Sequence, residues 1–208
     1  MSRELVFYTN PMSRGRVARW MLEEVGQPYR AEILDYGPPM KSEAYRAINP
    51  MGKVPALVHG DTIITESAAI CAYLADAFPA SGLAPPPTSH DRGPYYRWLM
   101  FGACPLEAAA SNSALGVVVP EEKRGMVGYG SVELVTDTLD RALSGRTYLA
   151  GNTFTAADLY ISAQLGWLTQ FGVIERRASI MAYIGTHLAR PAFKAAAAKD
   201  DALLPPRT

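Results

Sequence analysis

Asn49 to Ile70 reads Asn-Pro-Met-Gly-Lys-Val-Pro-Ala-Leu-Val-His-Gly-Asp-Thr-Ile-Ile-Thr-Glu-Ser-Ala-Ala-Ile, and this stretch decides the fold. Two short apolar segments, residues 56–58 and 62–64, are separated by a turn that contains glycine, and they predict two β-strands. Glu66 and Ser67 follow and open a helix. The rest of the chain is interpreted outward from this unit.

The Val54-Pro55 pair stands at the mouth of the first of these strands. Proline cannot donate a ladder hydrogen bond, so it suits an edge, a first strand position or a cis turn. We predict a cis bond, which turns the N–H and C=O of Val54 outward, where an extended peptide can pair with them like an added strand. Ser67 offers a hydroxyl and free backbone N–H groups that favour a carboxylate. The stretch therefore predicts a peptide clamp next to an anion site.

The first part of the chain alternates strands and helices around this stretch. We expect, in order, a strand over residues 4–9, a helix from Arg14 that stops at Gly26, a strand over 29–34, a loop with a short irregular helix over 36–48, the two strands, and a helix over 67–78. Residues 79–94 contain five prolines and predict a linker. The predicted domains are residues 1–79 and 95–208, joined by residues 80–94.

The second part is expected to be all helical. Residues 95–115 predict a helix with a break near Cys104-Pro105, and residues 121–144 predict another. Thr155 and Asp158 have capping-box spacing and open a helix that is apolar on nearly every side, which predicts the central core helix. Pro191 fits the first position of the terminal helix. The fold class is therefore α/β followed by an all-α domain.

Composition narrows the function classes. The 208 residues carry 20 basic and 20 acidic side chains, so the net charge is +0. The excess of positive charge expected in a protein that binds nucleic acids or anionic membranes is absent. Cys71 and Cys104 have no paired spacing, which argues against a disulfide framework or a zinc site and favours a reducing, cytoplasmic setting. The N-terminus lacks the apolar core of a signal peptide, and no apolar run reaches the ~18 residues of a membrane span.

The motif Asn-Pro-Met-Gly-Lys-Val-Pro-Ala-Leu, followed by Thr65-Glu66-Ser67-Ala-Ala-Ile and Tyr73-Leu74, resembles the glutathione site of the cytosolic glutathione transferases. The resemblance, to a bacterial, serine-type member, is strongest over residues 5–78 and looser beyond, where the cap at Thr155 is a second match. It implies an N-terminal thioredoxin-like domain with a cis-proline and a C-terminal helical bundle domain.

The resemblance also implies roles for individual residues. Val54 would pair with the cysteinyl part of glutathione, and Glu66 with Ser67 would hold its γ-glutamyl end. Lys53 would reach the glycine carboxylate as a point charge, with Lys41 as a second candidate. By themselves, Lys53 is an ordinary solvated lysine and Glu66 an ordinary first-turn acid.

Catalysis needs the glutathione thiolate, because a free thiol of this type ionises only near pH ~8.5. Ser13 lies between the first strand and the first helix, where a hydroxyl and a helix N-terminus can stabilise the anion. Its alternative interpretation is a plain N-cap serine. Tyr8 is the rival donor, although a strand tyrosine is more often a packing residue. The family's redox branches carry a cysteine where this chain has Met12 and Ser13, so thiol exchange lacks its nucleophile.

The resemblance implies an enzyme of detoxification that adds glutathione, as co-substrate and without a metal, to a small hydrophobic electrophile. It also implies a homodimer. A non-catalytic module that binds glutathione or apolar ligands, and a glutathione-dependent peroxidase or isomerase, remain alternatives. Aromatic and methionine side chains that could line an apolar pocket show no readable pattern: Met12, Tyr95, Trp98, Phe101, Trp167 and Phe171.

Overall fold

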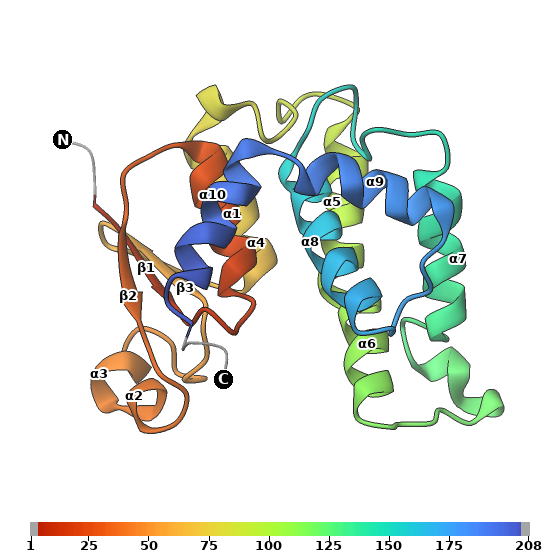
Figure 1. Ribbon diagram of the computed structural model, residues 1–208, viewed down its shortest axis with the longest axis horizontal. Helices are drawn as coiled ribbons and strands as arrows, with labels where there is room; N and C mark the ends of the chain where they lie inside the picture. Colours follow the sequence, from red (N-terminus) through yellow and green to blue (C-terminus); the bar gives the residue numbers. More distant parts are fainter. Residues whose placement is uncertain (1–3, 205–208) are drawn as a thin grey trace. The chain divides into compact units, whose positions relative to one another are not determined.

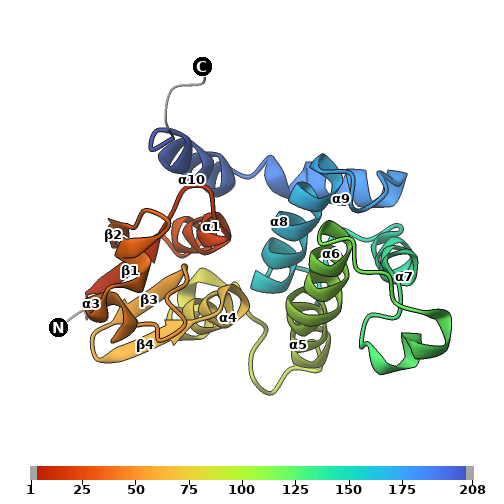
Figure 2. The same cartoon turned by 90° about the horizontal axis from the view of Figure 1, so that it is seen from below.

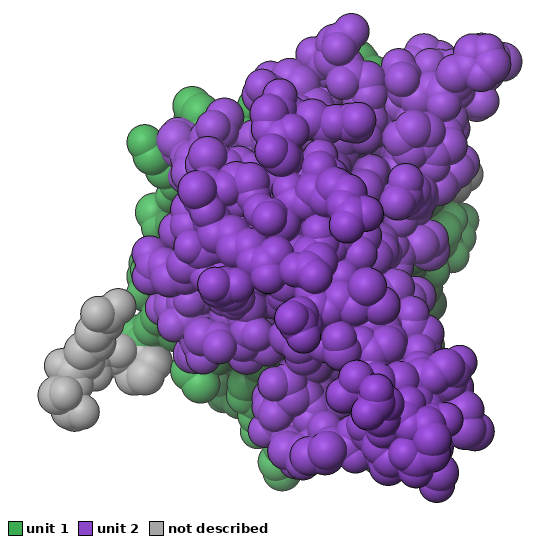
Figure 3. Space-filling view, turned by 90° about the vertical axis from the view of Figure 1, so that its right-hand side faces the viewer, with its two compact units in different colours: residues 1–83, 190–208 green, residues 84–189 purple. Residues whose placement is uncertain are grey.

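The computed structural model describes residues 4–204. Residues 1–3, on which the expectation of no signal peptide partly rests, and residues 205–208 lie outside the described part. The chain forms two compact units, coloured separately in Figure 3. Unit 1 contains the chain up to Leu83 together with the residues from Arg190 onward, and unit 2 runs from Ala84 to Ala189.

Unit 1 is built on a four-stranded mixed sheet with the order β2-β1-β3-β4. Its strands are β1 (Leu5–Thr9), β2 (Arg30–Ile33), β3 (Ala56–His59) and β4 (Thr62–Thr65). β1 pairs with β2 in parallel and with β3 antiparallel, and β3 pairs antiparallel with β4. The predicted strands and their order along the chain are confirmed, and the parallel pair follows from the helix that connects β1 to β2.

Helices α1 (Gly15–Val25) and α4 (Ser67–Ala77) contact each other and the sheet (Figures 1 and 2). Their apolar faces meet the inward side chains of β1 and β3 in a core that includes Phe7, Trp20, Leu57, Ile70 and Leu74. α1 ends at Gly26, which adopts a φ of 71° that suits glycine, as predicted.

Two short helices, α2 (Pro38–Lys41) and α3 (Glu43–Arg46), form the irregular segment that the sequence predicted. Met40 and Tyr45 from these helices pack with Ala56 at the start of β3. A 3-10 turn, η1 (Pro79–Ser81), follows α4.

The last helix, α10 (Pro191–Asp201), packs against α1 in unit 1 (Figure 1). The sequence assigned it to a domain of residues 95–208, so the observed grouping differs from that assignment. Trp20 and Phe193 meet edge to face with centroids 4.9 Å apart, and Nε and Nη2 of Arg190 donate to the Glu24 carboxylate at 2.6 and 2.8 Å. These contacts tie the end of the chain to its first helix.

Unit 2 is helical throughout its regular structure (Figure 2). It contains α5 (Arg92–Phe101), the π-helix η2 (Gly102–Leu106), α6 (Glu107–Ala114), the 3-10 helix η3 (Glu121–Met126), α7 (Val132–Leu143), α8 (Ala156–Gln170) and α9 (Ala178–Leu188). The break expected near Cys104-Pro105 is the π-helix, because Pro105 has no N–H for the α-helical ladder.

The prediction of one helix over residues 121–144 is wrong in its first half. η3 ends at Met126, and α7 begins only at Val132. Gly130 between them adopts a φ of 67°, and the Ser131 hydroxyl accepts the Leu134 N–H at 3.0 Å as an N-cap. These residues start a new helix instead of continuing the old one.

α8 is the central helix of unit 2, as predicted. Ala156, Ala157, Leu159, Ile161 and Leu165 are fully buried in it. Thr155 and Asp158 form the expected capping box at its start.

Candidate functional site

The peptide bond between Val54 and Pro55 is cis, as predicted. The loop in front of it is fixed at the Lys53 carbonyl, which accepts the Tyr45 hydroxyl at 2.6 Å and the Asn49 side-chain amide at 2.8 Å. Val54 itself is half-buried, and within residues 4–204 its N–H and C=O make no hydrogen bond. Its main chain is therefore available to an extended peptide.

The start of α4 is a second polar feature with free hydrogen-bonding groups. Glu66 is the one non-glycine residue in the described chain with positive φ, at φ 65° and ψ 122°, and its side chain is exposed. Ser67, the first helical residue, is 8% exposed, and no side chain of the described residues caps the helix. The first amide N–H groups of α4 and the Ser67 hydroxyl thus form a small donor cluster that suits a carboxylate.

Strand register brings these features to one end of the sheet, where β1 and β4 end and β3 begins; this end is called the sheet edge below. Ala56 faces Thr65 across β3 and β4, and it faces Tyr8 across β3 and β1. Continuing each pairing outward places Val54 beside the start of α4 and beside the end of β1, which leads to Ser13. The structure thus gathers the clamp, the helix start and the loop of residues 10–13.

Ser13 is buried, with 8% of its surface exposed, and its hydroxyl has two local partners. The hydroxyl donates to the Asn10 carbonyl at 2.7 Å and accepts the Gly15 N–H at 2.9 Å. The second contact satisfies the N–H of the first residue of α1, although the N-cap residue of that helix is Arg14. A Cβ on Gly15 would lie 1.9 Å from the Thr9 hydroxyl oxygen, so only glycine lets α1 begin this close to β1.

Tyr8 lies at the same edge and packs as a partly buried aromatic. Its ring is tilted against that of Tyr45 at a centroid distance of 5.6 Å, beside Met40 and Ala56. Burial, with a smaller contribution from Tyr8, raises the pKa of Tyr45 to about 12, so Tyr45 is a neutral donor to the Lys53 carbonyl. Neither Tyr45 nor Asn49 was predicted from the sequence to support this loop.

The two lysine candidates differ. The Lys53 side chain is exposed at the loop before Val54. Lys41 instead donates to the Met51 carbonyl at 3.0 Å and the Gly52 carbonyl at 2.8 Å, so it supports the loop. Gly52 has a φ of 58°, and a Cβ there would come within 2.5 Å of the Met40 carbonyl oxygen.

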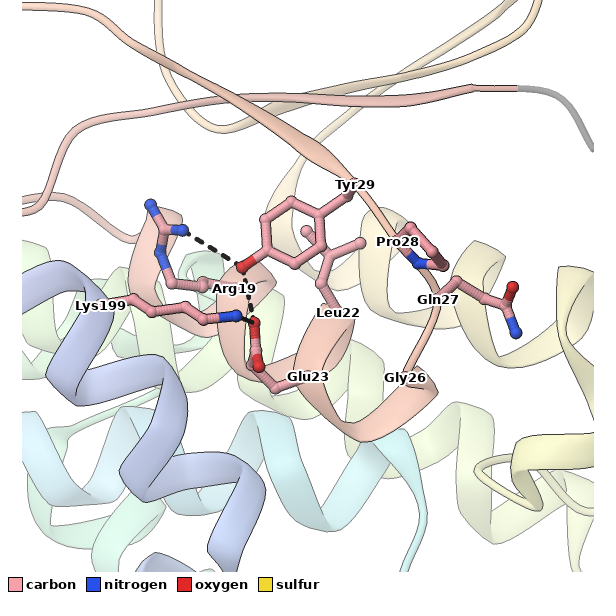
Figure 4. Close-up of a pocket in the computed structure, with 8 residues that line it drawn as sticks. All are labelled: Arg19, Leu22, Glu23, Gly26, Gln27, Pro28, Tyr29 and Lys199. Carbon is pink, nitrogen blue, oxygen red and sulfur yellow. Dashed lines mark hydrogen bonds and ion pairs between the residues drawn. The ribbon is translucent and has the colours of Figure 1, made fainter.

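A cavity of about 530 Å³ lies elsewhere in unit 1, beside α1 and α10 (Figure 4). None of the predicted site residues lines it. Figure 4 shows the Tyr29 hydroxyl hydrogen-bonded to Arg19 and Glu23, and the Lys199 amine hydrogen-bonded to Glu23. These polar groups already pair with one another.

The residues proposed for an apolar pocket divide by burial. Tyr95 is fully buried and Trp98 is 4% exposed, so both belong to the core of unit 2. Met12, Trp167 and Phe171 are exposed.

Comparison with known proteins identifies the family. Residues 7–85 match the model of the glutathione S-transferase N-terminal domain, and residues 122–191 match that of the C-terminal domain. Glutathione S-transferase GST-4.5 of Xanthomonas campestris is 30% identical over 171 residues, which cover 80% of this chain and 83% of that protein. The chain belongs to the glutathione S-transferase family.

Solved structures of other glutathione S-transferases share the fold. The Xylella fastidiosa enzyme matches with a TM-score of 0.79 and 25% identity, over 95% of this chain and 99% of the other. A sphingomonad glutathione S-transferase, solved in complex with glutathione, matches with a TM-score of 0.75 and 31% identity over 94% and 98%.

The N-terminal family model covers every candidate site residue of this glutathione S-transferase, from Tyr8 to Ser67. Within residues 4–204, no group of three or more metal-ligating side chains comes together. No helix of that described range is both long and apolar enough to cross a bilayer.

Proposed function

We propose that this glutathione S-transferase binds reduced glutathione at the sheet edge formed by Val54 and the start of α4. The observation that carries the proposal is the register that sets the unpaired main chain of Val54 beside the open helix start at Ser67. Val54 pairs with the cysteinyl residue, Ser67 with the γ-glutamyl carboxylate and Glu66 with its ammonium group. Lys53 attracts the glycine carboxylate. The sphingomonad relative in complex with glutathione supports this assignment.

Ser13 is our proposed thiolate donor. To act, its hydroxyl hydrogen must leave the Asn10 carbonyl, which keeps the Ser13 backbone N–H at 3.0 Å as a partner. The turn therefore loses one neutral hydrogen bond, a net cost of about 0.5–1.5 kcal/mol. A hydrogen bond to a thiolate is charge-assisted and roughly twice as strong as a neutral one. The exchange favours the thiolate, and the N-terminus of α1 adds to it.

The reaction we propose is addition of this thiolate to a small hydrophobic electrophile. The protein acts as a cytoplasmic homodimer and needs no metal. A non-catalytic module that binds glutathione or apolar ligands is the second candidate, favoured by the local hydrogen bonds that now occupy the Ser13 hydroxyl. A glutathione-dependent peroxidase or isomerase would use the same site.

Steady-state kinetics of Ser13→Ala and Tyr8→Phe test the donor. We expect Ser13→Ala to lower kcat about 100-fold, as loss of one donor to a developing anion does, with little change in glutathione affinity. Tyr8→Phe is expected to stay near the parent value. Unchanged turnover in Ser13→Ala together with a loss in Tyr8→Phe would identify Tyr8 instead. Glutathione binding without turnover on halo-aromatic, enone and peroxide substrates would favour the binding module.

A further inference from the structure

The last two residues of α10 are both carboxylates, Asp200 and Asp201. A helix C-terminus carries partial negative charge, so acidic side chains are unfavourable there, and Lys or Arg would stabilise the helix. α10 instead directs both carboxylates at arginines of α1. Asp200 pairs with Arg19 at 2.8 Å, and Asp201 pairs with Arg16. The two carboxylates at the end of α10 therefore stabilise its contact with α1 and do not stabilise the helix itself.

The two arginines make different contacts. Arg19 is 3% exposed, lies 5.3 Å from the Phe7 ring centroid, and donates to the Tyr29 hydroxyl at 3.2 Å (Figure 4). These contacts all lie within unit 1, and Arg19 also lines the cavity of Figure 4. Arg16 lies in the first turn of α1 and contacts the loop that precedes the helix. Its Nε donates to the Pro11 carbonyl at 2.7 Å, while Nη2 donates to Asp201.

The loop of residues 10–13 is tied at each of its first three carbonyls. The Asn10 carbonyl accepts from Ser13, the Pro11 carbonyl from Arg16, and the Met12 carbonyl from the Tyr36 hydroxyl at 3.1 Å. Pro11 has no N–H, so its carbonyl is its one main-chain hydrogen-bonding group. Arg16 therefore holds Pro11 in the loop of residues 10–13, which ends at Ser13.

We propose that Arg16, held by Asp201 of the terminal helix, is a positioning residue that fixes the loop of residues 10–13 and thereby the Ser13 hydroxyl. Arg16 acts through the Pro11 carbonyl and does not touch the substrate. The inference rests on the proposed role of Ser13 in glutathione chemistry. It makes the last residue of α10 part of the support of the active site.

Magnitudes separate this role from a purely structural one. The Arg16 side chain is 25% exposed and that of Asp201 is 60% exposed, and ion pairs this exposed contribute little to global stability. A misplacement of a catalytic group by about 1 Å can lower a rate by as much as about 100-fold. Loss of the tie should therefore reduce turnover while the protein stays folded.

The test compares Arg16→Lys and Asp201→Asn with the parent protein. Lysine keeps the charge but loses the planar fork that reaches both partners, and asparagine keeps the shape of Asp201 without its charge. We expect Arg16→Lys to lower kcat about tenfold, with glutathione affinity within about twofold, and to move the pH profile of turnover upward. Asp201→Asn should act in the same direction and more weakly. The double variant should have the same turnover as Arg16→Lys, because both substitutions disrupt the same connection from Asp201 through Arg16 to the Pro11 carbonyl.

Arg30→Lys is the matched control. Arg30 is likewise an ion-paired arginine of unit 1, more exposed than Arg16, and its partners are Glu4 and Glu32. The turnover, the pH profile and the urea midpoint of the Arg30→Lys variant should match those of the parent protein.

Three results would count against the inference. An active parent with an unchanged Arg16→Lys variant would overturn it alone. A fall in turnover matched by an equal fall in glutathione affinity or by a lower urea midpoint would show a general structural role. A parent that neither binds nor turns over glutathione would contradict the proposed function itself, and this inference with it.

Discussion

Two helix starts in this protein carry the same kind of sequence signal and differ in what they do with it. α8 opens with Thr155 and Asp158, and α4 opens after Glu66 with Ser67. Each pairs an acidic side chain with a hydroxyl at a helix N-terminus, which favours helix initiation. The difference lies in the partners that the fold supplies to each pair.

The start of α8 is closed. Asp158 is fully buried and accepts four hydrogen bonds, from the Leu149 N–H at 2.7 Å, the Thr155 N–H at 2.9 Å, the Thr155 hydroxyl at 2.8 Å and the Tyr183 hydroxyl at 2.6 Å. Its carboxylate has no capacity left for a ligand and no access to one. This helix start is a stabilising device of unit 2.

The start of α4 is open. The Glu66 backbone adopts a conformation that L-residues rarely use, its side chain is exposed, and no side chain caps the helix. A residue held at positive φ typically costs about 1–3 kcal/mol and is found disproportionately at binding sites. The comparison shows that partners and backbone conformation, rather than residue type, separate a stability element from a candidate binding site.

The largest expected effect is at the closed site. Asp158→Ala leaves four donors without their acceptor, each costing about 1–3 kcal/mol, so the free energy of unfolding should fall by about 4 kcal/mol or more. Urea denaturation followed by circular dichroism measures it. Asp137→Ala is the control, because that carboxylate of α7 is 46% exposed and pairs with Arg177, and its loss should cost at most about 1 kcal/mol. Equal losses in the two variants would remove the distinction between buried and exposed carboxylates.

A smaller effect is expected from Tyr183→Phe, which removes one donor to Asp158. The cost should be about 1.5–2 kcal/mol, because the acceptor is charged but keeps its other donors. Burial, followed by the nearby Asp158 charge, raises the pKa of Tyr183 well above 10. The folded state thus holds the proton that the unfolded state loses above pH 10, so this stability is full below pH 10 and declines as pH rises further.

Unfolding midpoints of parent and Tyr183→Phe, measured below and above pH 10, check the sign. The gap between the two proteins should narrow above pH 10. A gap that widens with pH would mean that Tyr183 ionises more easily in the folded protein than in the unfolded chain.

The smallest effect concerns the open site. Glu66→Gly removes the unfavourable φ but adds chain entropy to the unfolded state, so a net gain of about 1 kcal/mol in stability is expected. Glu43→Gly, at the first position of α3 where φ is ordinary, should instead lose about 0.5–1 kcal/mol. If thermal unfolding gives a loss of the same size for both variants, the Glu66 conformation carries no strain.

Sequence alone predicted those features of both units that local rules determine. The cis Val54-Pro55 bond, the stop of α1 at Gly26 and the cap at Thr155 each depend on neighbours within a few residues. The candidate residues at the sheet edge came from a motif whose spacing is equally local. Their roles stay predictions.

Features that depend on distant partners were not predictable. The packing of α10 on α1 depends on Asp200 and Asp201 meeting arginines about 180 residues earlier, and the alanine-rich helix gives no sign of them in its own sequence. α9 was not predicted. Lys41 was a candidate for a ligand carboxylate, but its amine is committed to loop carbonyls, a choice that depends on how residues 49–53 fold.

Calorimetric titration of reduced glutathione into the parent protein and Ser67→Ala tests the central claim most directly. A hydrogen bond to a charged group contributes about 1.5–3 kcal/mol, so removal of the Ser67 hydroxyl should weaken binding at least about tenfold. Its removal should leave the urea midpoint nearly unchanged, because within the described residues that hydroxyl does not cap α4 by a hydrogen bond. No heat with the parent protein, or equal affinity in the two proteins, would contradict a glutathione site at the start of α4.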